Sequence, residues 1–419
     1  MLKEKMLVPQ LRFSEFEGDW KINKLGQIAK FLKGKGISKN DIINDGENEC
    51  IRYGELYTTY NEVIDSIASK TNVALDVSVL SNENDVIIPS SGETQLDIVT
   101  ASCVLKKGVI LGGDLNIIRT NLNGVFLSYL LNNRKKKDIA KLSQGNSVVH
   151  LYNKQLATLN LNLPTPKEQQ KIANFLTSID NRIQTLEKKK TLLEQYKKGV
   201  MQKIFKQELR FKDDTSTTLK ASDGKEFPEW EEKKFSKFIK LYRGSSPRPI
   251  NRYLTKEKSG VNWIKIGDTK ASRNYLLESV SEKITVAGSL KSRKVRKGEL
   301  ILANSMSFGK TYILNIDGCI YDGWFVLREF GDYFEKRFLI QQLNSEHMQR
   351  QYKRLSTGGV VQNISSAIVY STKLRRPSLK EQTKIANFLS AIDRNIELVT
   401  KKIEHTKTYK KGLLQQIFL

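Results

Sequence analysis

Two long stretches of the chain carry apolar residues at alternating spacings of three and four, with polar residues between them. A heptad pattern sustained over roughly five heptads is typical of a long helix that pairs with another helix in a coiled coil. At 1.5 Å per residue, about 40 residues form a rod on the order of 60 Å long. The residues expected to pair the two helices are Ile172, Leu176, Ile179, Ile183, Leu186 and Leu193 in the first stretch and Ile385, Leu389, Ile392, Ile396, Val399 and Ile403 in the second.

The two stretches are copies of each other. Residues 161–205 align with residues 374–418 without a gap, at a constant offset of 213 residues, and about half of the aligned positions are identical. Each copy opens with the pattern of a capping box, because Thr165 precedes Glu168, and Ser378 precedes Glu381, by three residues. In a capping box the hydroxyl and the carboxylate satisfy backbone N–H groups reciprocally at the helix start. A self-match at one offset indicates an internal duplication.

Four polar residues interrupt the two apolar seams. Lys190 and Lys197 stand in the first seam, and Thr406 and Lys410 stand in the second. Long lysine side chains can lie at the edge of a seam with their charges in water. Alternatively, polar residues in a seam fix the register of the helices and the choice of partner. The sequence leaves both interpretations open.

The duplication extends to the segments before each helix. Residues 51–55 (IRYGE) align with residues 264–268 (IKIGD) at the same offset, and Trp20 and Trp230 each precede an amphipathic, helix-like segment. Runs rich in Val, Ile and aromatic residues predict strands at 85–89, 98–104, 108–111, 298–303, 311–316 and 319–327, and helical patterns occur at 124–133 and 333–350. Each half is therefore predicted to be an α+β domain followed by a long helix.

The resulting domain organisation is a tandem repeat with pseudo-twofold symmetry, in which the two helices pair antiparallel. We expect globular domains at residues 1–163 and 210–376, and helices at residues 164–209 and 377–419. The second domain begins with a polar stretch, residues 212–225, that is predicted to be a linker.

The net charge of the chain indicates the kind of partner that it binds. The formal net charge is +25, because 70 Lys and Arg outnumber 45 Asp and Glu. Such an excess favours a polyanion, nucleic acid above all. No run of 18 apolar residues and no signal-peptide pattern is present, so a cytoplasmic protein without membrane contact is expected. Cys50, Cys103 and Cys319 lack metal-ligand spacing, so neither a disulfide nor a zinc site is expected.

The sequence lacks the motifs of an enzyme. Gly309-Lys310-Thr311 resembles the end of a phosphate-binding loop, but Asn304 stands where the first glycine is required. The Asn-Pro-Pro-aromatic and Asp-Pro-Pro-aromatic motifs of amino-methyltransferases are absent. The three histidines stand apart and do not form a repeated triad or metal pattern. We therefore expect a binding protein that has no catalytic residues and binds no cofactor or metal of its own.

Candidate DNA-binding residues are basic or amide side chains in loops that contain glycine or serine. Arginine and lysine bond guanine edges or phosphates, and glutamine and asparagine suit the N6 and N7 edge of adenine. The alternatives are a solvated basic loop and a glycine turn at a helix start. The candidates are Lys33, Lys35, Lys39, Gln144 and Asn146 in the first half, and Arg243, Ser245, Ser246, Arg248, Arg252, Lys310, Gln362 and Asn363 in the second half.

The arrangement resembles the specificity subunit of a type I restriction-modification system, of the kind common in Gram-positive bacteria. The motifs that carry the resemblance are the Lys-Glu-Gln helix openings, the Tyr-Lys-Lys-Gly sequence near the end of both helices, and Leu-Arg-Phe at residues 11–13 and 209–211. Two divergent domains alternate with these similar helices over nearly the whole chain.

This resemblance implies a function for each part. The globular domains would be target recognition domains, each reading a few base pairs of a split, asymmetric site in double-stranded DNA, and the helices would be the spacer. The partners would be two modification subunits, which use S-adenosylmethionine to methylate adenine, and two restriction subunits, which use ATP and Mg to translocate and cut DNA. Without the resemblance, the residues also allow a coiled-coil scaffold with basic RNA- or protein-binding domains, or a transcription regulator.

Overall fold

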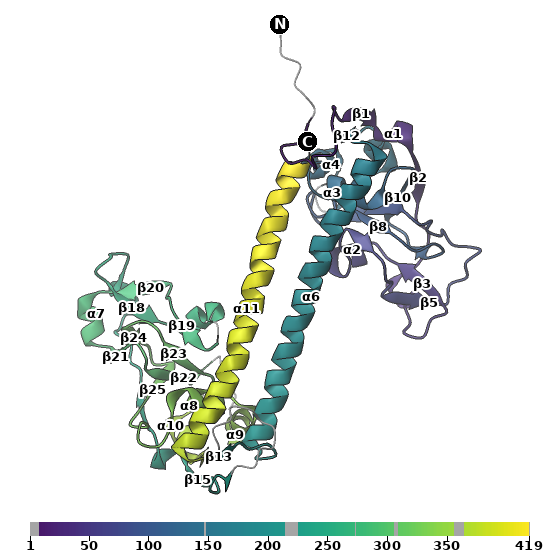
Figure 1. Ribbon diagram of the computed structural model, residues 1–419. Helices are drawn as coiled ribbons and strands as arrows, with labels where there is room; N and C mark the ends of the chain where they lie inside the picture. Colours follow the sequence, from purple (N-terminus) through teal and green to yellow (C-terminus); the bar gives the residue numbers. More distant parts are fainter. Residues whose placement is uncertain are drawn as a thin grey trace. The chain divides into compact units, whose positions relative to one another are not determined.

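The computed structural model describes residues 8–145, 148–213, 225–272, 274–305, 309–355 and 364–418. The chain divides into two compact units. Unit 1 contains Met1–Glu187 and Lys401–Leu419, and unit 2 contains Lys188–Thr400. Two long helices, α6 (Pro166–Phe205) and α11 (Leu379–Ile417), each contribute one part to each unit (Figure 1). Both helices lie within the ranges that the heptad pattern predicts.

In unit 1, the first half of α6 lies antiparallel to the last turns of α11. Lys410 Nζ lies 2.7 Å from Asp180 Oδ1, and Lys407 Nζ lies 2.6 Å from Glu187 Oε1, so residue numbers fall along α11 as they rise along α6. The apolar side chains of the two helices share one buried cluster with the domain. These are Ile172, Leu176, Ile179 and Ile183 of α6 and Leu413 and Ile417 of α11.

In unit 2, the last turns of α6 pack against the first turns of α11, which is the same antiparallel arrangement. Lys197 Nζ lies 2.7 Å from Asp393 Oδ1. The buried seam residues here are Val200 and Ile204 of α6 and Ile385, Leu389 and Ile392 of α11. Of the remaining predicted seam residues, Val399 and Ile403 are buried, whereas Leu186, Leu193 and Ile396 are half-buried.

The ion pairs decide between the two interpretations of the polar seam residues. Lys197 and Lys410 are equivalent at the offset of 213, and so are their partners Asp393 and Asp180. All four side chains are at most 17% exposed, so these pairs form only when the helices adopt this register. Lys190, in contrast, is partly exposed and lies 3.4 Å from Glu194 on its own helix, as expected for a lysine at a seam edge.

The globular part of unit 1 has two sheets. A five-stranded sheet has the order β2 (Ala29–Lys33), β10 (Leu115–Thr120), β6 (Asp85–Pro89), β8 (Ser102–Val104) and β4 (Val63–Ile64). A second sheet has the order β5 (Ser69–Thr71), β3 (Asn48–Ile51) and β9 (Ile110–Leu111). Alternate residues of β6 face opposite ways: Val86 and Ile88 face the helices, and Ile87 faces the second sheet.

Unit 2 repeats the topology of the first sheet and has two more strands in the second. Its first sheet has the order β16 (Lys240–Arg243), β25 (Trp324–Arg328), β22 (Leu300–Ala303), β23 (Thr311–Leu314) and β19 (Leu276–Leu277). Its second sheet has the order β17 (Leu254–Thr255), β20 (Glu282–Ile284), β18 (Val261–Ile264), β24 (Gly318–Ile320) and β21 (Arg293–Val295). Both first sheets are antiparallel except at the last pair, where β4 and β19 run parallel to their neighbours. The α+β prediction is confirmed for both domains.

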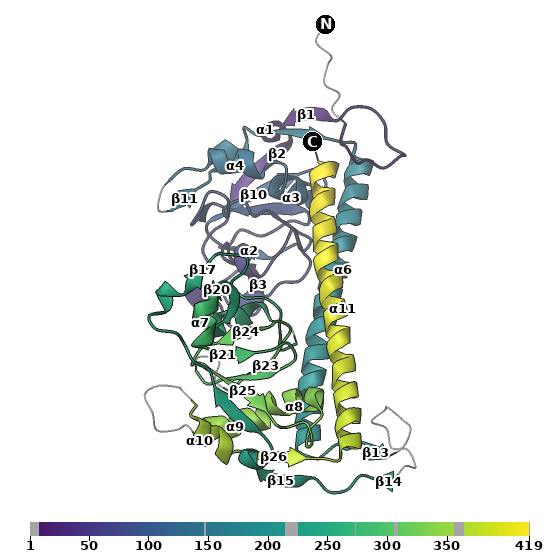
Figure 2. The same ribbon diagram turned by 90° about the vertical axis from the view of Figure 1, so that its left-hand side faces the viewer.

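Short elements complete the two units. In unit 1 they are β1 (Lys21–Lys24), α1 (Leu25–Ile28), α2 (Glu55–Thr58), β7 (Ser91–Gly92), α3 (Gly124–Asn132), α4 (Lys136–Leu142), β11 (Val149–His150), α5 (Asn153–Leu156) and β12 (Asn160–Leu163). In unit 2 they are β13 (Lys212–Asp213), β14 (Lys225–Glu226), β15 (Glu231–Lys234), α7 (Val286–Leu290), α8 (Lys336–Leu343), α9 (Glu346–Leu355), α10 (Ser366–Ser371) and β26 (Lys373–Arg376). Figure 2 shows β15 and β26 beside the start of α11.

Several sequence-based boundaries were wrong. The strand predicted at 319–327 is two strands, β24 and β25, separated by a turn, and residues 98–101 precede β8 without joining it. The helix predicted at 333–350 is broken at Asn344, because the amide of Asn344 bonds the backbone of Thr311 in both directions, at 3.0 and 2.9 Å. The helix-like segments after the two tryptophans are single short turns that lead into strands β2 and β16. The ends of the predicted linker pair as β13 and β14.

The predicted capping boxes form only in part. The hydroxyls of Thr165 and Ser378 accept from the backbone N–H of Glu168 and Glu381, at 3.4 and 3.3 Å. The buried carboxylate of Glu168, however, accepts from the side chains of Arg12 and Trp20, at 2.8 and 3.2 Å. The helix start is therefore tied to the globular domain, because a buried carboxylate is satisfied best by charged and indole donors.

The same network occurs in unit 2, and it gives the Leu-Arg-Phe segments a structural role. Glu381 accepts from Arg210 and Trp230, at 3.0 Å each. The N–H of Leu11 donates to the carbonyl oxygen of Gln416 near the end of α11, at 3.0 Å. The N–H of Leu209 donates to Lys203, the equivalent residue of α6, at 3.2 Å. The start of the chain therefore completes unit 1 in the way that residues 209–211 complete unit 2.

Candidate nucleic-acid interface

In the first domain, the basic loop leaves the end of strand β2. The N–H of Gly34 donates to the carbonyl oxygen of Leu115, and that of Lys35 donates to Leu111, at 2.9 and 3.0 Å. A Cβ atom on Gly34 would lie 1.9 Å from the carbonyl oxygen of Gly112, so only glycine fits this approach. The side chains of Lys33, Lys35 and Lys39 are exposed. The loop thus combines a fixed backbone with free cationic side chains.

The second predicted loop of this domain lies at the same end of the sheet. Gln144 and His150 bond through their backbones at 2.9 and 2.7 Å, and His150 pairs with Ser91 of β7, two residues beyond the end of β6. The side-chain amide of Asn153 donates to Leu32 of β2 at 2.9 Å. The fold therefore brings exposed Gln144 to the edge that carries Lys33 and Lys35. Asn146 lies outside the described residues.

This edge also carries aromatic side chains that the sequence did not single out. The rings of His150 and Tyr152 stack with centroids 6.2 Å apart, and Tyr152 is 50% exposed. Exposed aromatic rings contact bases and sugars, so these two residues join the candidates. The available signal was the pair of aromatic residues His150 and Tyr152 a few positions after Gln144 and Asn146.

In the second domain, the loop after β16 has the same backbone anchors. The N–H of Gly244 donates to Trp324 and that of Ser245 donates to Ile320, at 2.9 and 3.1 Å. A Cβ on Gly244 would lie 1.9 Å from the carbonyl oxygen of Tyr321. Residues 33–35 and 243–245 thus occupy equivalent places with different side chains.

The hydrogen bonds separate the structural from the exposed residues of this second loop. Ser246 Oγ donates to Asp322 Oδ1 at 2.7 Å, and Ser245 Oγ donates to the carbonyl oxygen of Lys291 at 3.3 Å, so both hydroxyls hold the loop. Arg248 is 83% exposed, with its guanidinium 3.8 Å from Asp322. Arg243 and Arg252 are also exposed, and Arg243 Nε donates to the carbonyl oxygen of Asp322 at 3.3 Å. The arginines are therefore the residues of this loop that can meet a ligand.

A basic groove beside this loop was missed by sequence reasoning. It has a volume of about 640 Å³ and lies between the loop and strand β21. The guanidinium groups of Arg293 and Arg328 lie 5.7 and 5.5 Å from the centroid of the Tyr242 ring, and Arg293 Nε donates to the carbonyl oxygen of Arg243. The lining residues are Ser245, Leu290, Lys291, Ser292, Arg293, Lys294, Arg296, Glu299 and Arg328. The available signal was the basic run at residues 291–297.

Of two carboxylates near this groove, Glu299 lines it, and Glu329 lies outside its lining and accepts from the Tyr242 hydroxyl. Glu299 accepts from Arg328 Nε at 2.7 Å, and this hydrogen bond raises the pKa of Arg328. Hydrogen bonds from Lys240, and then from Tyr242, hold the pKa of Glu329 below its usual value. Because both carboxylates are already paired, the lysine and arginine side chains along residues 291–296 give the groove its positive character.

The other predicted residues fall elsewhere. Lys310 lines a different cleft, beside the end of α6, and is not brought to the loop of residues 243–252. Gln362 and Asn363 lie outside the described residues. Over the described ranges, no group of three His, Cys, Asp or Glu side chains is arranged to hold a metal ion, and no helix is long and apolar enough to cross a membrane. The three cysteines are buried free thiols.

Comparison with known proteins adds the decisive observation. The model of the type I restriction modification DNA specificity domain matches the chain twice, over residues 17–195 and 228–407. The chain belongs to this family. Because both halves match a DNA specificity domain, this type I specificity subunit recognises DNA, and the scaffold alternative is not favoured.

Two curated relatives are similar to this specificity subunit over nearly its whole length. It is 26% identical over 425 residues to the type I restriction enzyme MjaVIII specificity subunit of Methanocaldococcus jannaschii, covering 96% of this chain and 94% of the relative. It is 30% identical over 421 residues to the putative MjaX specificity subunit of the same organism, covering 96% and 93%.

Two solved structures share the fold at low sequence identity. The type I restriction-modification S subunit from M. genitalium superposes with a TM-score of 0.61 at 15% identity, covering 98% of this chain and 99% of that chain. A chain from a study of complex assembly and conformational transition of the type I system gives a TM-score of 0.57 at 18% identity, covering 95% and 96%.

The two loop glycines of this specificity subunit give a prediction with matched controls. Gly34→Ala and Gly244→Ala each force a methyl group against a carbonyl oxygen, so we expect each to destabilise its domain by about 1–3 kcal/mol. Gly54→Ala and Gly267→Ala, which meet no atom within 4 Å, should be nearly neutral. Thermal unfolding measures the stability. Equal losses in all four variants would contradict the close approach.

Proposed function

We propose that this chain is the non-catalytic subunit that reads a bipartite, asymmetric DNA site, with one domain for each half-site. The observation that carries the proposal is the loop that is built twice. Residues 33–35 and 243–245 have the same backbone anchors and the same glycine contact, but their side chains are Lys-Gly-Lys and Arg-Gly-Ser. Because the two loops share a backbone but present different side chains, they support two domains that recognise different DNA sequences.

The candidate side chains of the two domains support two kinds of DNA contact, with bases and with phosphates. Arg243 and Arg248 can bond guanine O6 and N7 bidentately, and Gln144 can bond adenine N6 and N7. The lysines of residues 33–39 and the groove along residues 291–296 suit phosphates, whose contacts position the protein without reading sequence. Arg328 is held by Glu299, so its role is to support the groove wall.

The partners follow from the same proposal. Two modification subunits supply S-adenosylmethionine-dependent adenine methylation, two restriction subunits use ATP and Mg to translocate and cut DNA, and the whole acts in the bacterial cytoplasm. Because part of the surface of α6 is repeated on α11, it supports the binding of two copies of the same partner subunit. Tyr196 and Tyr409 are equivalent residues, 51% and 56% exposed, and each is followed by a glycine, Gly199 or Gly412, with nothing within 4 Å of its Cβ position. A half-exposed tyrosine beside an open mid-helix glycine leaves room for close approach by another helix.

Exchange of one domain tests the proposed function. Replacing residues 17–160 with the corresponding segment of another family member, and sequencing the methylated adenines made by the assembled methyltransferase, should change one half-site and leave the other intact. The reciprocal exchange of residues 228–372 should change the other half-site. A motif in which both halves change, or neither does, would contradict one reader for each half-site.

A further inference from the structure

Outside the DNA-reading edges, unit 1 contains a basic cleft at the end of α11. Its volume is about 610 Å³. The walls are the last turns of α11, the junction of α3 and α4, and the start of the described chain, and the lining residues are Val8, Gln10, Asn132, Asn133, Arg134, Lys136, Lys137, Lys411, Leu414, Gln415, Gln416 and Phe418. Four of these residues are cationic and none is acidic.

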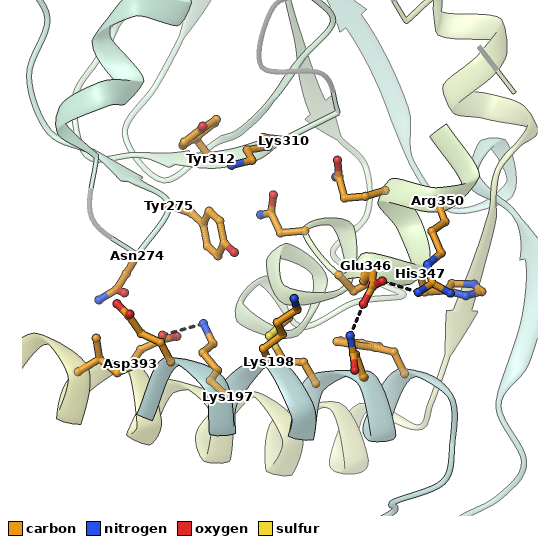
Figure 3. Close-up of a pocket in the computed structure, with 18 of the residues that line it drawn as sticks. Lys197, Lys198, Asn274, Tyr275, Lys310, Tyr312, Glu346, His347, Arg350 and Asp393 are labelled. Atoms are coloured by element: carbon orange, nitrogen blue, oxygen red, sulfur yellow. Dashed lines mark hydrogen bonds and ion pairs between the residues drawn. The ribbon is translucent and has the colours of Figure 1, made fainter. Parts of the chain in front are cut away.

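Unit 2 contains a cleft of about 740 Å³ at the end of α6 (Figure 3). Lys198, Met201, Gln202 and Phe205 form one wall, and the junction of α8 and α9 forms another, with Asn344 and Arg350. Its three acidic residues, Glu194, Glu346 and Asp393, are already paired, and Glu194 lies 3.4 Å from Lys190 on the same helix. Asp393 bonds Lys197, and Glu346 bonds Arg350 and Gln202, as the dashed lines in Figure 3 show.

The two clefts share a helix-end wall and the contacts that support it. Lys198, Met201, Gln202 and Phe205 are equivalent, at the offset of 213, to Lys411, Leu414, Gln415 and Phe418. Asn132 bonds both backbone groups of Ala101, at 2.6 and 2.8 Å, just as Asn344 bonds those of Thr311. Phe418 packs on Phe126, and Phe205 packs on Phe338, with centroids 5.6 and 5.8 Å apart.

The side chains that line the two clefts indicate what kind of ligand would bind there. Leu414 and Phe418, or Met201 and Phe205, supply an apolar floor, and exposed lysine and arginine side chains supply the rim. We propose that each helix-end cleft receives an amphipathic peptide segment with acidic residues along one edge, carried by a partner subunit that attaches in two copies. The apolar side chains of the segment would cover the floor, and its carboxylates would meet the basic rim.

Two features favour a peptide over a DNA backbone. A phosphodiester backbone has no apolar side to cover leucine, methionine and phenylalanine, whereas an amphipathic peptide does. In addition, the helix-end walls of the two clefts keep Lys, Gln and Phe at equivalent positions, while the loops that face DNA have diverged. This inference rests on the proposed function, because it assigns the clefts to the modification subunit that would bind twice.

Charge reversal on the equivalent rim lysines tests the proposal. Lys198 and Lys411 are exposed on long helices, so Lys198→Glu and Lys411→Glu should leave folding and the melting temperature unchanged. The probe is the purified modification subunit of the same system, titrated into the full chain and followed by sedimentation velocity. Each single variant should bind one copy normally and the other at least about tenfold more weakly, and the double variant should weaken both. Lys189→Glu with Lys402→Glu, an equivalent exposed pair outside the clefts, should bind two copies as the unchanged chain does.

The remaining outcomes overturn the proposal in distinguishable ways. Two copies bound at full affinity by the double variant would show that the clefts do not receive the partner. If that variant also lost affinity for a non-target duplex, the lysines would be phosphate contacts, and the proposed function would stand. If the unchanged chain bound no modification subunit, the assignment of partners would fail, and the cleft proposal would fail with it.

Discussion

A chain that ends at Gln207 is expected to form a symmetric dimer that, with the modification subunit, directs methylation to a palindrome. Such a chain retains the first domain and all of α6 but lacks the segment of α11 that completes unit 1. The exposed apolar seam of α6 is costly in water. In unit 1 the missing segment is residues 401–418, and residues 188–205 of a second copy are its sequence equivalent. Two copies can therefore complete each other isologously.

Most contacts of unit 1 are retained when residues 188–205 of a second copy replace residues 401–418. Val200, Ile204 and Phe205 replace Leu413, Ile417 and Phe418 in the buried cluster. Lys197 of the second copy replaces Lys410 and meets Asp180, so each helix carries both halves of its own ion pair. The pattern is self-complementary, because Asp180 and Lys197 of one copy meet Lys197 and Asp180 of the other.

At two positions the contact made in unit 1 is lost. These losses make the dimer weaker than the pairing of α6 with α11 in the full chain. Buried Ile403 is replaced by Lys190, and Lys407, which lies 2.6 Å from Glu187, is replaced by Glu194. The change Lys190→Ile with Glu194→Lys restores both contacts and should tighten the dimer at least about tenfold, since burying an isoleucine contributes about 1.5–3 kcal/mol.

The end point of the chain matters because of the Leu-Arg-Phe segments. In the dimer, residues 209–211 of one copy would compete with residues 11–13 of the other for Glu168. Ending at Gln207 removes this competition. A chain that continues to Lys212 should therefore form a weaker or less uniform dimer than the shorter one.

Sedimentation equilibrium and methylome sequencing test these expectations together. Lys197→Asp should abolish the dimer by placing like charges at both pairs, and the double change Asp180→Lys with Lys197→Asp should recover it in part. A folded monomer at all concentrations, or methylation of the original asymmetric site, would contradict the self-complementary pairing.

Removal of the Glu381 carboxylate is expected to destabilise unit 2 strongly. Glu381 is buried and accepts from Arg210 and Trp230, and Arg210 is only 20% exposed. Glu381→Ala removes the buried carboxylate that pairs with a largely buried guanidinium and leaves an indole N–H without its acceptor, which costs about 3 kcal/mol when one partner of a buried pair is removed. For a unit of this size, the melting temperature should fall by roughly 6–12 °C.

The matched controls use the same network. Glu168→Ala should destabilise unit 1 in the same way, because Arg12 and Trp20 repeat the contacts. Glu229→Ala removes another partner of Arg210, but that side chain is 91% exposed, so the loss should stay below about 1 kcal/mol. Hydrogen exchange should localise the Glu381→Ala effect to the start of α11 and to residues 227–234. Faster exchange spread evenly over both units would argue against a local network.

The sequence determined the repeat, the long helices and the α+β class, because these depend on local periodicity. The heptad spacing follows from 3.6 residues per turn, and the offset of 213 is visible wherever both copies remain similar. The basic loops that contain glycine or serine were located as well, since turn composition is also local. The same reasoning failed where distant residues intervene. Asn344 breaks a continuous helical pattern because it bonds Thr311, which lies 33 residues earlier.

Only the tertiary structure decided what the polar residues do. Lys197 and Lys190 look alike in the seam, yet Lys197 pairs with Asp393 and Lys190 stays at the edge. Glu168 and Glu381 read as caps but hold an arginine and a tryptophan from segments more than 140 residues away in sequence. The basic groove and the paired clefts likewise combine segments from several elements. Apolar patterning is a property of each segment, whereas the partner of a charge depends on which segments the fold brings within a few ångströms.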